Sequence, residues 1–184
     1  MMGRASAETE ASLLVALLTA NSGLGPVMDD GIELFDALHG NVAGSGGAPG
    51  STTLSAGVEA MRTQKGLSGE PINAVPVYLL VSPAKEFVAR QAVASFYPAT
   101  SATTNPLAGS VTVLVEPRLT GTRWYLFADP AVLPILEYSY LSSAPGPQMQ
   151  SREGFEVLGI EFRVVLDYGA GVLDYRGAYT NAGA

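Results

Sequence analysis

The chain has 184 residues, of which 47% are apolar and 15% charged, and its formal net charge is −7. This length and composition suit one sizeable hydrophobic core and exclude a chain that is disordered throughout. The ten basic residues are dispersed, so sequence-specific nucleic-acid binding, which needs clustered Lys and Arg, is not expected. Cysteine is absent, which excludes disulfide frameworks, thiolate zinc sites and thiol nucleophiles.

Glycine (21) and proline (12) are spread along the chain and predict short elements joined by turns in a mixed α+β fold. Residues 7–21 have leucines at helical spacing and end in Asn-Ser-Gly, which predicts a helix. Its apolar run, residues 11–18, is far shorter than the roughly 20 residues of a membrane-spanning helix. Glu8 and Glu10 stand where a signal peptide would be positive. No membrane partner is expected.

The middle of the chain predicts a strand followed directly by a helix. A glycine-rich segment, 40–53, reads as a flexible surface loop, and a helix is expected over 53–65 with a glycine stop. Residues 75–81 are apolar at both odd and even positions, which is typical of a strand buried on both faces. Ser82 and Pro83 are residues favoured at a helix start, and the helix body runs to about residue 96.

Three shorter strands are expected after a loop that covers residues 97–110. They occupy residues 111–115, 123–128 and 135–141, and prolines or turn residues stop each of them. The sequence contains no internal repeat and no convincing linker that would separate two independent domains.

The C-terminal part has the clearest strand pattern of the chain. From residue 158 to 166 the even positions are apolar, whereas the odd ones include Glu161, Arg163 and, just beyond, Asp167. This period of two predicts a half-buried strand. The apolar phase changes next to Gly159, which favours a bulge, so one long, bent strand is expected over about 155–166.

Reactive groups are scarce. His39 is the only histidine, which excludes a multi-histidine metal site. Asp36 and Asn41 could orient it, yet a hydrogen-bonding structural role outweighs catalysis for a lone histidine beside a glycine turn. No serine nucleophile elbow, phosphate loop or EF-hand spacing is present, and the pairs Asp29–Asp30 and Asp167–Asp174 read as turn formers. No catalytic, cofactor-binding or metal-binding residue is assigned, and enzymatic activity is not expected.

Segments along nearly the whole chain resemble, in order, the major head subunit of Mu-like phages or prophages. The matching segments are Leu13-Leu-Val-Ala-Leu-Leu-Thr-Ala-Asn, Asp30-Gly-Ile-Glu-Leu-Phe, His39-Gly-Asn, Met61-Arg-Thr-Gln-Lys-Gly, Tyr78-Leu-Leu-Val-Ser-Pro, Val115-Glu-Pro-Arg-Leu, Trp124-Tyr-Leu-Phe-Ala-Asp-Pro and Glu153-Gly-Phe-Glu-Val-Leu-Gly-Ile-Glu-Phe-Arg-Val-Val-Leu-Asp-Tyr-Gly-Ala.

The resemblance implies the Hong Kong 97-type capsid fold, an α+β fold with an axial domain and a peripheral domain. Residues 1–52 would be the end of the spine helix and a connecting loop of the peripheral domain. Residues 53–134 would be the axial α/β lobe, and residues 135–184 would return to the peripheral domain as a long bent antiparallel strand pair. Relatives carry an N-terminal arm, an extended loop and most of the spine helix upstream of this point, so a truncated, processed or split subunit is expected.

The function implied is structural: a tailed-phage or prophage capsid subunit that self-assembles into the icosahedral shell around the genome. Partners would be copies of itself in pentamers and hexamers, with a scaffold or a protease as candidate partners during head assembly. The location would be the virion capsid, assembled in the host bacterial cytoplasm. The charged face formed by Glu161, Arg163 and Asp167 is the expected subunit-contact strip.

Two other classes of function stay open from the sequence. One is a serine hydrolase or prohead peptidase centred on His39. The other is a phage decoration or tail binding module, which separate axial and peripheral lobes would distinguish from a shell subunit.

Overall fold

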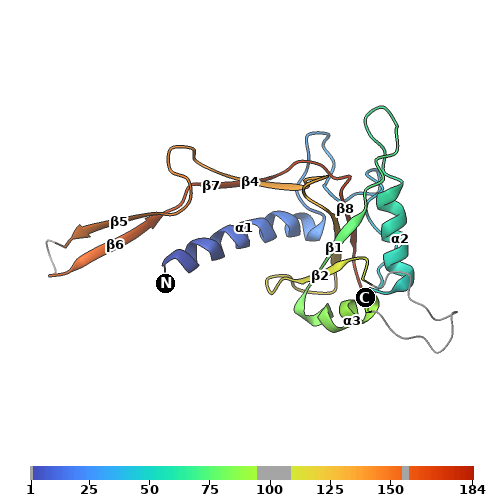
Figure 1. The fold of residues 1–184 in the computed structure, drawn as a ribbon, viewed down its shortest axis with the longest axis horizontal. Coiled ribbons are helices and arrows are strands. Elements are labelled where there is room, and N and C mark those ends of the chain that lie inside the picture. Colours follow the sequence, from blue (N-terminus) through green and yellow to red (C-terminus); the bar gives the residue numbers. More distant parts are fainter. Residues whose placement is uncertain (1, 95–108, 155–157) are drawn as a thin grey trace.

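A four-stranded sheet forms the centre of a lobe, and helix α1 and a two-stranded ribbon extend side by side away from that lobe (Figure 1). The computed structural model describes residues 2–94, 109–154 and 158–184. The elements in chain order are α1 (Met2–Gly23), α2 (Ser51–Arg62), β1 (Pro76–Val81), η1 (Pro83–Lys85), α3 (Glu86–Val93), β2 (Thr112–Val115), β3 (Trp124–Ala128), β4 (Leu136–Tyr140), β5 (Gln148–Glu153), β6 (Ile160–Val165), β7 (Tyr168–Val172) and β8 (Ala178–Asn181).

The lobe sheet has the strand order β2-β1-β3-β8, with β1 and β2 parallel and the other pairs antiparallel. Alternate residues of β3 point to opposite faces, as the period of a strand requires. Trp124 and Leu126 join one hydrophobic cluster, which includes Leu54 of α2, while Tyr125 joins a second cluster, which includes Leu18 of α1. The sheet is therefore covered on both faces, and the prediction of a doubly buried strand at β1 agrees with this position.

The start of the helix after β1 differs from the prediction in one respect. Ser82 does precede Pro83 at the first position of η1. The Ser82 hydroxyl, however, donates to the carbonyl oxygen of Gly121 at 2.8 Å and makes no cap bond to η1. Because Ser82 is buried beside the β2–β3 connection, its side chain fastens that connection to the lobe.

The glycine-rich segment expected to be flexible is attached to the core at Gly47. Trp124 donates from its indole nitrogen to the Gly47 carbonyl at 2.8 Å, and the Gly47 amide donates to Asn181 Oδ1 at 2.8 Å. Trp124 and Asn181 are both buried. The polar edge of a core tryptophan needs a partner, and the loop backbone supplies it.

Helix α1 ends where the backbone turns into the left-handed region. Asn21 and Ser22 have φ values of 49° and 60°, a conformation that short polar side chains tolerate better than most. The Asn21 side-chain amide donates to the Gly25 carbonyl at 2.9 Å, and the Tyr125 hydroxyl donates to the Gly23 carbonyl at 3.2 Å. The C-terminal end of α1 is thus fixed to the lobe sheet.

The ribbon consists of two antiparallel pairs, β4–β7 next to the lobe and β5–β6 beyond them (Figure 1). The expected single strand over 155–166 is wrong, because the chain reverses there: Gly154 donates to the Gly159 carbonyl at 2.9 Å, and β6 begins only at Ile160. Residues 155–157 of that expectation lie outside the described part. The change of apolar phase at Gly159 marks the end of a hairpin. The partner strand, β5, is polar and showed no alternating pattern.

Candidate functional site

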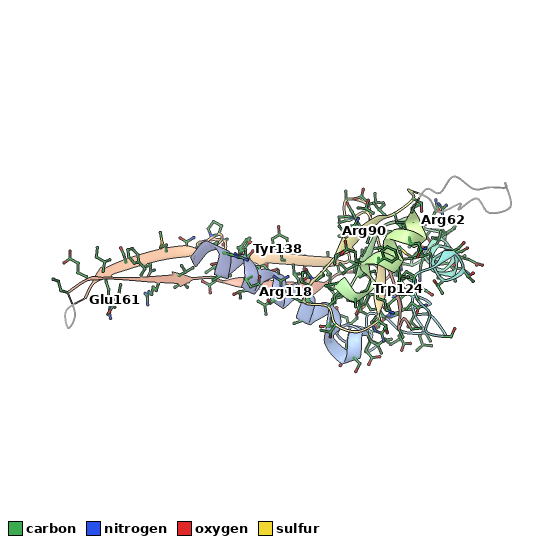
Figure 2. All side chains as sticks on the ribbon, turned by 90° about the horizontal axis from the view of Figure 1, so that it is seen from below. Arg62, Arg90, Arg118, Trp124, Tyr138 and Glu161 are labelled. Carbon is green, nitrogen blue, oxygen red and sulfur yellow. The ribbon has the colours of Figure 1, made fainter. Side chains whose placement is uncertain are left out.

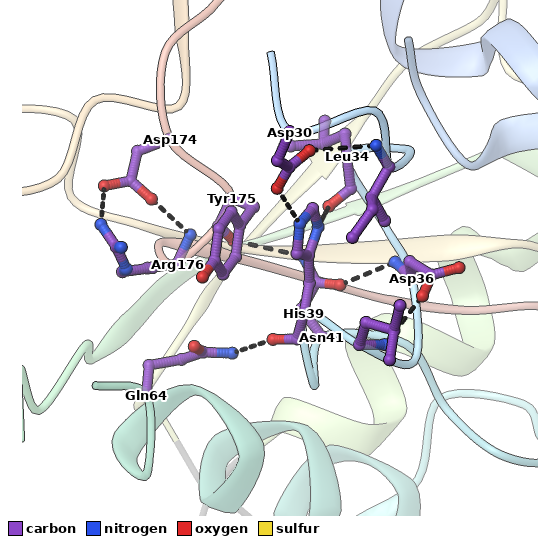
Figure 3. Close-up of polar contacts among 11 residues, drawn as sticks. Asp30, Leu34, Asp36, His39, Asn41, Gln64, Asp174, Tyr175 and Arg176 are labelled. Carbon is purple, nitrogen blue, oxygen red and sulfur yellow. Dashed lines mark hydrogen bonds and ion pairs between the residues drawn. The ribbon is translucent and has the colours of Figure 1, made fainter. Parts of the chain in front are cut away.

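The His39 ring is held between acceptors inside the lobe (Figure 3). Its Nε2 lies 2.8 Å from Asp30 Oδ2, and its Nδ1 lies 3.2 Å from the Leu34 carbonyl oxygen. The ring stacks on Tyr175 at 3.8 Å between centroids, and His39 is only 6% exposed. Both partners of the ring nitrogens are acceptors, so neither nitrogen faces a group from which it could remove a proton.

Further hydrogen bonds make this cluster a joint between distant segments. The Asn41 side chain donates to the carbonyls of Leu34 (2.8 Å) and Tyr175 (3.2 Å), and Gln64 donates to the His39 carbonyl at 2.8 Å. The joint connects the segment before the glycine-rich loop to the end of α2 and to the chain just before β8. These contacts fit a structural histidine.

The orienting residues expected for His39 are not those found. Asp36 accepts instead from the Leu38 backbone amide at 2.7 Å, and Asn41 bonds backbone groups. The ring is positioned instead by Asp30, which was expected only to form a turn, and by Tyr175, for which the sequence indicated no role. The hydrogen bond from His39 is the largest cause that lowers the pKa of Asp30 below its ordinary value of 3.8.

Asp29, Asp30 and Asp174 line one open cavity, and two of them already have partners. Asp30 contacts His39, while Asp174 accepts a hydrogen bond from the Arg176 guanidinium at 3.1 Å. Among the residues that the structure describes, no three His, Asp or Glu side chains come together in a group that could hold a metal ion.

A seam of small and aromatic residues joins α1 to the ribbon. Tyr138, Tyr140 and Tyr168 form a mutual cluster with ring centroids 5.6 to 5.9 Å apart. Ala7 and Leu14 of α1 line a shallow cavity of about 260 Å³ with these three rings. Burial, followed by a hydrogen bond with Glu10 of α1, raises the pKa of Tyr140.

The hairpin β5–β6 carries two residues of the expected charged strip, Glu161 and Arg163, and Glu161 lies far from the lobe (Figure 2). Arg152 Nε lies 2.6 Å from Glu161 Oε2, and Arg163 Nε donates to Gln150 Oε1 at 2.7 Å. Glu161 and Arg163 therefore bond residues of their own hairpin. Asp167 is exposed between β6 and β7, and its carbonyl accepts from Leu141 at 3.4 Å.

The apolar face of the same hairpin is exposed, contrary to the expectation of a half-buried strand. Directly opposite residues share a face, so Ile160, Phe162 and Val164 lie with Glu153, Ser151 and Met149. Ile160 is 62% exposed, Phe162 53% and Met149 70%. Strand periodicity indicates which residues share a face, but it does not show whether the chain has anything to cover that face.

In the described ranges, no helix is both long and apolar enough to cross a membrane.

Comparison with known proteins identifies one family. The model of the family described as phage capsid protein matches residues 1–181. No curated protein matches the sequence.

Two solved phage structures are similar at low identity. A chain from the capsid of cyanophage P-SCSP1u has 14% identity and a TM-score of 0.48, with 73% of this chain and 46% of that chain covered. A chain from the procapsid of satellite phage P4, a structure that includes the size determination protein, has 10% identity and a TM-score of 0.43, with 71% and 38% covered. This chain thus spans less than half the length of either. Because the family match extends over residues 1–181, the chain belongs to the phage capsid protein family.

Proposed function

We propose that this chain is a structural subunit that assembles with copies of itself into the shell of a tailed-phage head. The family match over residues 1–181 is the observation that carries the proposal. The shape supports it: α1 and the ribbon project well beyond the lobe (Figure 1), and such extensions provide contact surface between repeated subunits.

The geometry around His39 supports a structural reading over the hydrolase or prohead peptidase alternative. Its ring nitrogens face Asp30 and the Leu34 carbonyl, and Tyr175 covers one side of the ring. A general base needs a proton donor within hydrogen-bond reach, and the bonds of this ring are all to acceptors.

The finer proposal is a Hong Kong 97-type subunit of the Mu-like kind. Residues 53–134 would form the axial domain, and residues 1–52 and 135–184 the peripheral domain. The separation of lobe and ribbon favours this division, with two modifications. Leu34 is buried against Tyr125 and Gly47 accepts a hydrogen bond from Trp124, so the later part of residues 1–52 would be shared with the axial domain. Strand β8 pairs with β3 in the lobe sheet, so the end of the last segment would be shared with the axial domain as well.

The proposed partners are further copies in pentamers and hexamers, with a scaffold or a protease taking part in head assembly. The proposed location is the virion capsid, reached by assembly in the host bacterial cytoplasm. The strip of Glu161, Arg163 and Asp167 remains a proposed contact, as an ionic border beside neighbouring subunits.

Sedimentation velocity and negative-stain electron microscopy test the assembly proposal. The full-length subunit, expressed with and without the other head proteins of its phage, should form particles that sediment far above monomer mass. A protein that remains monomeric under both conditions contradicts the proposal. A His39→Gln variant that still assembles, with no hydrolytic activity in either protein, removes the peptidase alternative.

A further inference from the structure

The apolar face of the hairpin β5–β6 extends a strip that α1 covers only in part. Nearer the lobe, Val164 and Tyr168 line a groove with Ala5 and Thr9 of α1. Further out, the same face continues as Phe162 and then Ile160, which are both exposed, and Met149, which is also exposed, lies directly opposite Val164. One continuous apolar surface is therefore covered at one end and open to solvent at the other.

The exposed end of this apolar surface belongs to the hairpin β5–β6, which by itself would have little stability. In the part of the chain described, β5 and β6 pair only with each other, and a lone two-stranded hairpin is at best marginally stable in water. The polar face already bonds within the hairpin, through Arg152–Glu161 and Arg163–Gln150. Among the residues that the structure describes, none covers the outer part of the apolar face.

We propose that the face formed by Met149, Ile160 and Phe162 is the centre of a contact with a second copy of this chain. The proposal deepens the assembly function above and rests on it. It also changes the role of the charged strip: Glu161 and Arg163 would border the contact, because interfaces place apolar side chains at the centre and polar ones at the rim.

The exposed area of the molecule is large enough for such a contact. The whole chain exposes 11064 Å², whereas a compact monomer of this mass exposes about 8,400 Å². Specific interfaces bury about 800 Å² on each partner. The extra surface of this extended molecule exceeds that requirement.

Charge also favours a second copy as the occupant. The chain as a whole carries −7, so copies repel one another over most of their surface. The hairpin sequence, residues 148–165, carries only −1, because Arg152 and Arg163 offset two of its three glutamates, Glu153, Glu156 and Glu161. Two hairpin surfaces therefore repel each other less than the chains as a whole do, whereas the −7 charge disfavours nucleic acid.

Two aspartate substitutions on opposite faces of the hairpin test the proposal. Phe162→Asp puts a charge on the apolar face, while Gln150→Asp puts the same group on the polar face, where it can still accept the Arg163 hydrogen bond. Both residues are exposed. Circular dichroism and thermal unfolding of the monomer should therefore match wild type in both variants.

We expect Phe162→Asp to raise the protein concentration needed for assembly at least tenfold and Gln150→Asp to change it less than twofold, measured by sedimentation velocity on the full chain. Equal assembly of both variants overturns the proposed contact and leaves the assembly function intact. Equal loss in both overturns the assignment of the contact centre to the apolar face. Failure of wild type to assemble rejects the assembly function itself.

A thiol label supplies a second readout, because the chain contains no cysteine. Phe162→Cys or Gln150→Cys each introduces the only thiol, which can carry a polarity-sensitive fluorophore. The emission of a label at position 162 should shift to the blue on assembly, and that at position 150 should shift less. A label at position 162 that stays water-exposed in assembled particles contradicts the contact.

Discussion

Arg118, on the connection between β2 and β3, holds Glu8 of α1 across 110 residues of sequence. Its Nε donates to Glu8 Oε1 at 3.0 Å and its Nη2 lies 2.6 Å from Glu8 Oε2, while its Nη1 bonds Glu116 Oε1 at 2.6 Å. Neighbouring acidic groups, Glu8 first, raise the pKa of the guanidinium. The paired bond joins the projecting helix to the lobe at a second point, well before its end at Gly23.

Replacing Arg118 with Ala should loosen α1 more than it destabilises the fold. Glu8 is 61% exposed, and solvent screens exposed ion pairs so that they contribute little to stability. The free energy of unfolding should therefore change little. Hydrogen exchange of the first turns of α1 should nevertheless become faster.

Arg90→Ala is the matched control, because Arg90 pairs with Glu86 inside α3. It should leave hydrogen exchange in α1 unchanged. Unchanged exchange in the Arg118 variant as well means that the other contacts of α1, with the tyrosine cluster and with Tyr125, position the helix without Arg118.

The Asp30–His39 pair should stabilise the fold at pH values above the ordinary pKa of the carboxyl group. A lowered folded-state pKa gives stability that is present above 3.8 and is lost as the pH falls through the lower, folded value. Asp30→Asn should reduce the free energy of unfolding at pH 6 and flatten its decline in acid, measured by urea unfolding. In a His39→Gln background the same substitution should have little further effect, and additive losses would show that the two residues act separately.

Tyr125 should make the fold sensitive to alkali. Burial raises its pKa to about 12, so its contribution is complete below pH 10 and is lost as the pH rises toward 12. A difference of two units between the ordinary and the folded-state pKa corresponds to a loss of at most about 3 kcal/mol in the free energy of unfolding. Tyr125→Phe loses the hydrogen bond to the Gly23 carbonyl and should be less stable than wild type at pH 9. Urea unfolding at pH 11 should show a smaller difference between the two proteins, because only wild type loses stability through ionisation of Tyr125. The other tyrosines are common to both proteins, so their effects cancel. A constant difference contradicts the assignment.

Gly57→Ala should destabilise the lobe even though alanine favours helices. A Cβ at this position in α2 would lie 2.7 Å from Leu126 Cδ1 and 2.9 Å from the Tyr179 ring, both of which are buried. Overpacking costs about 1–3 kcal/mol, which exceeds the gain in helix propensity of about 1 kcal/mol. Thermal unfolding should therefore occur at a lower temperature. Gly3→Ala in α1, where a Cβ meets no atom within 4 Å, should not lower it.

Local pattern predicted most of the lobe and some of its chemistry. The alternation of Trp124, Tyr125 and Leu126 between the two faces follows from the strand period. Local pattern also predicted helices that overlap α1, α2 and α3, because helical spacing and a terminal glycine can be recognised within a few neighbouring residues. The scarcity of reactive groups also favoured a structural role, and the family match bears that out.

What only the tertiary structure decided depends on contacts between distant segments. The phase change at Gly159 suits a bulge or a hairpin end equally well, and the reversal is defined by the pairing of β5 with β6. Likewise, His39 meets Tyr175 only because β8 returns the chain to the lobe. Periodicity assigned Phe162 to an apolar face, but exposure depends on what the rest of the chain can reach. In this fold α1 covers the near end of that face and leaves Phe162 for a second copy, as we propose.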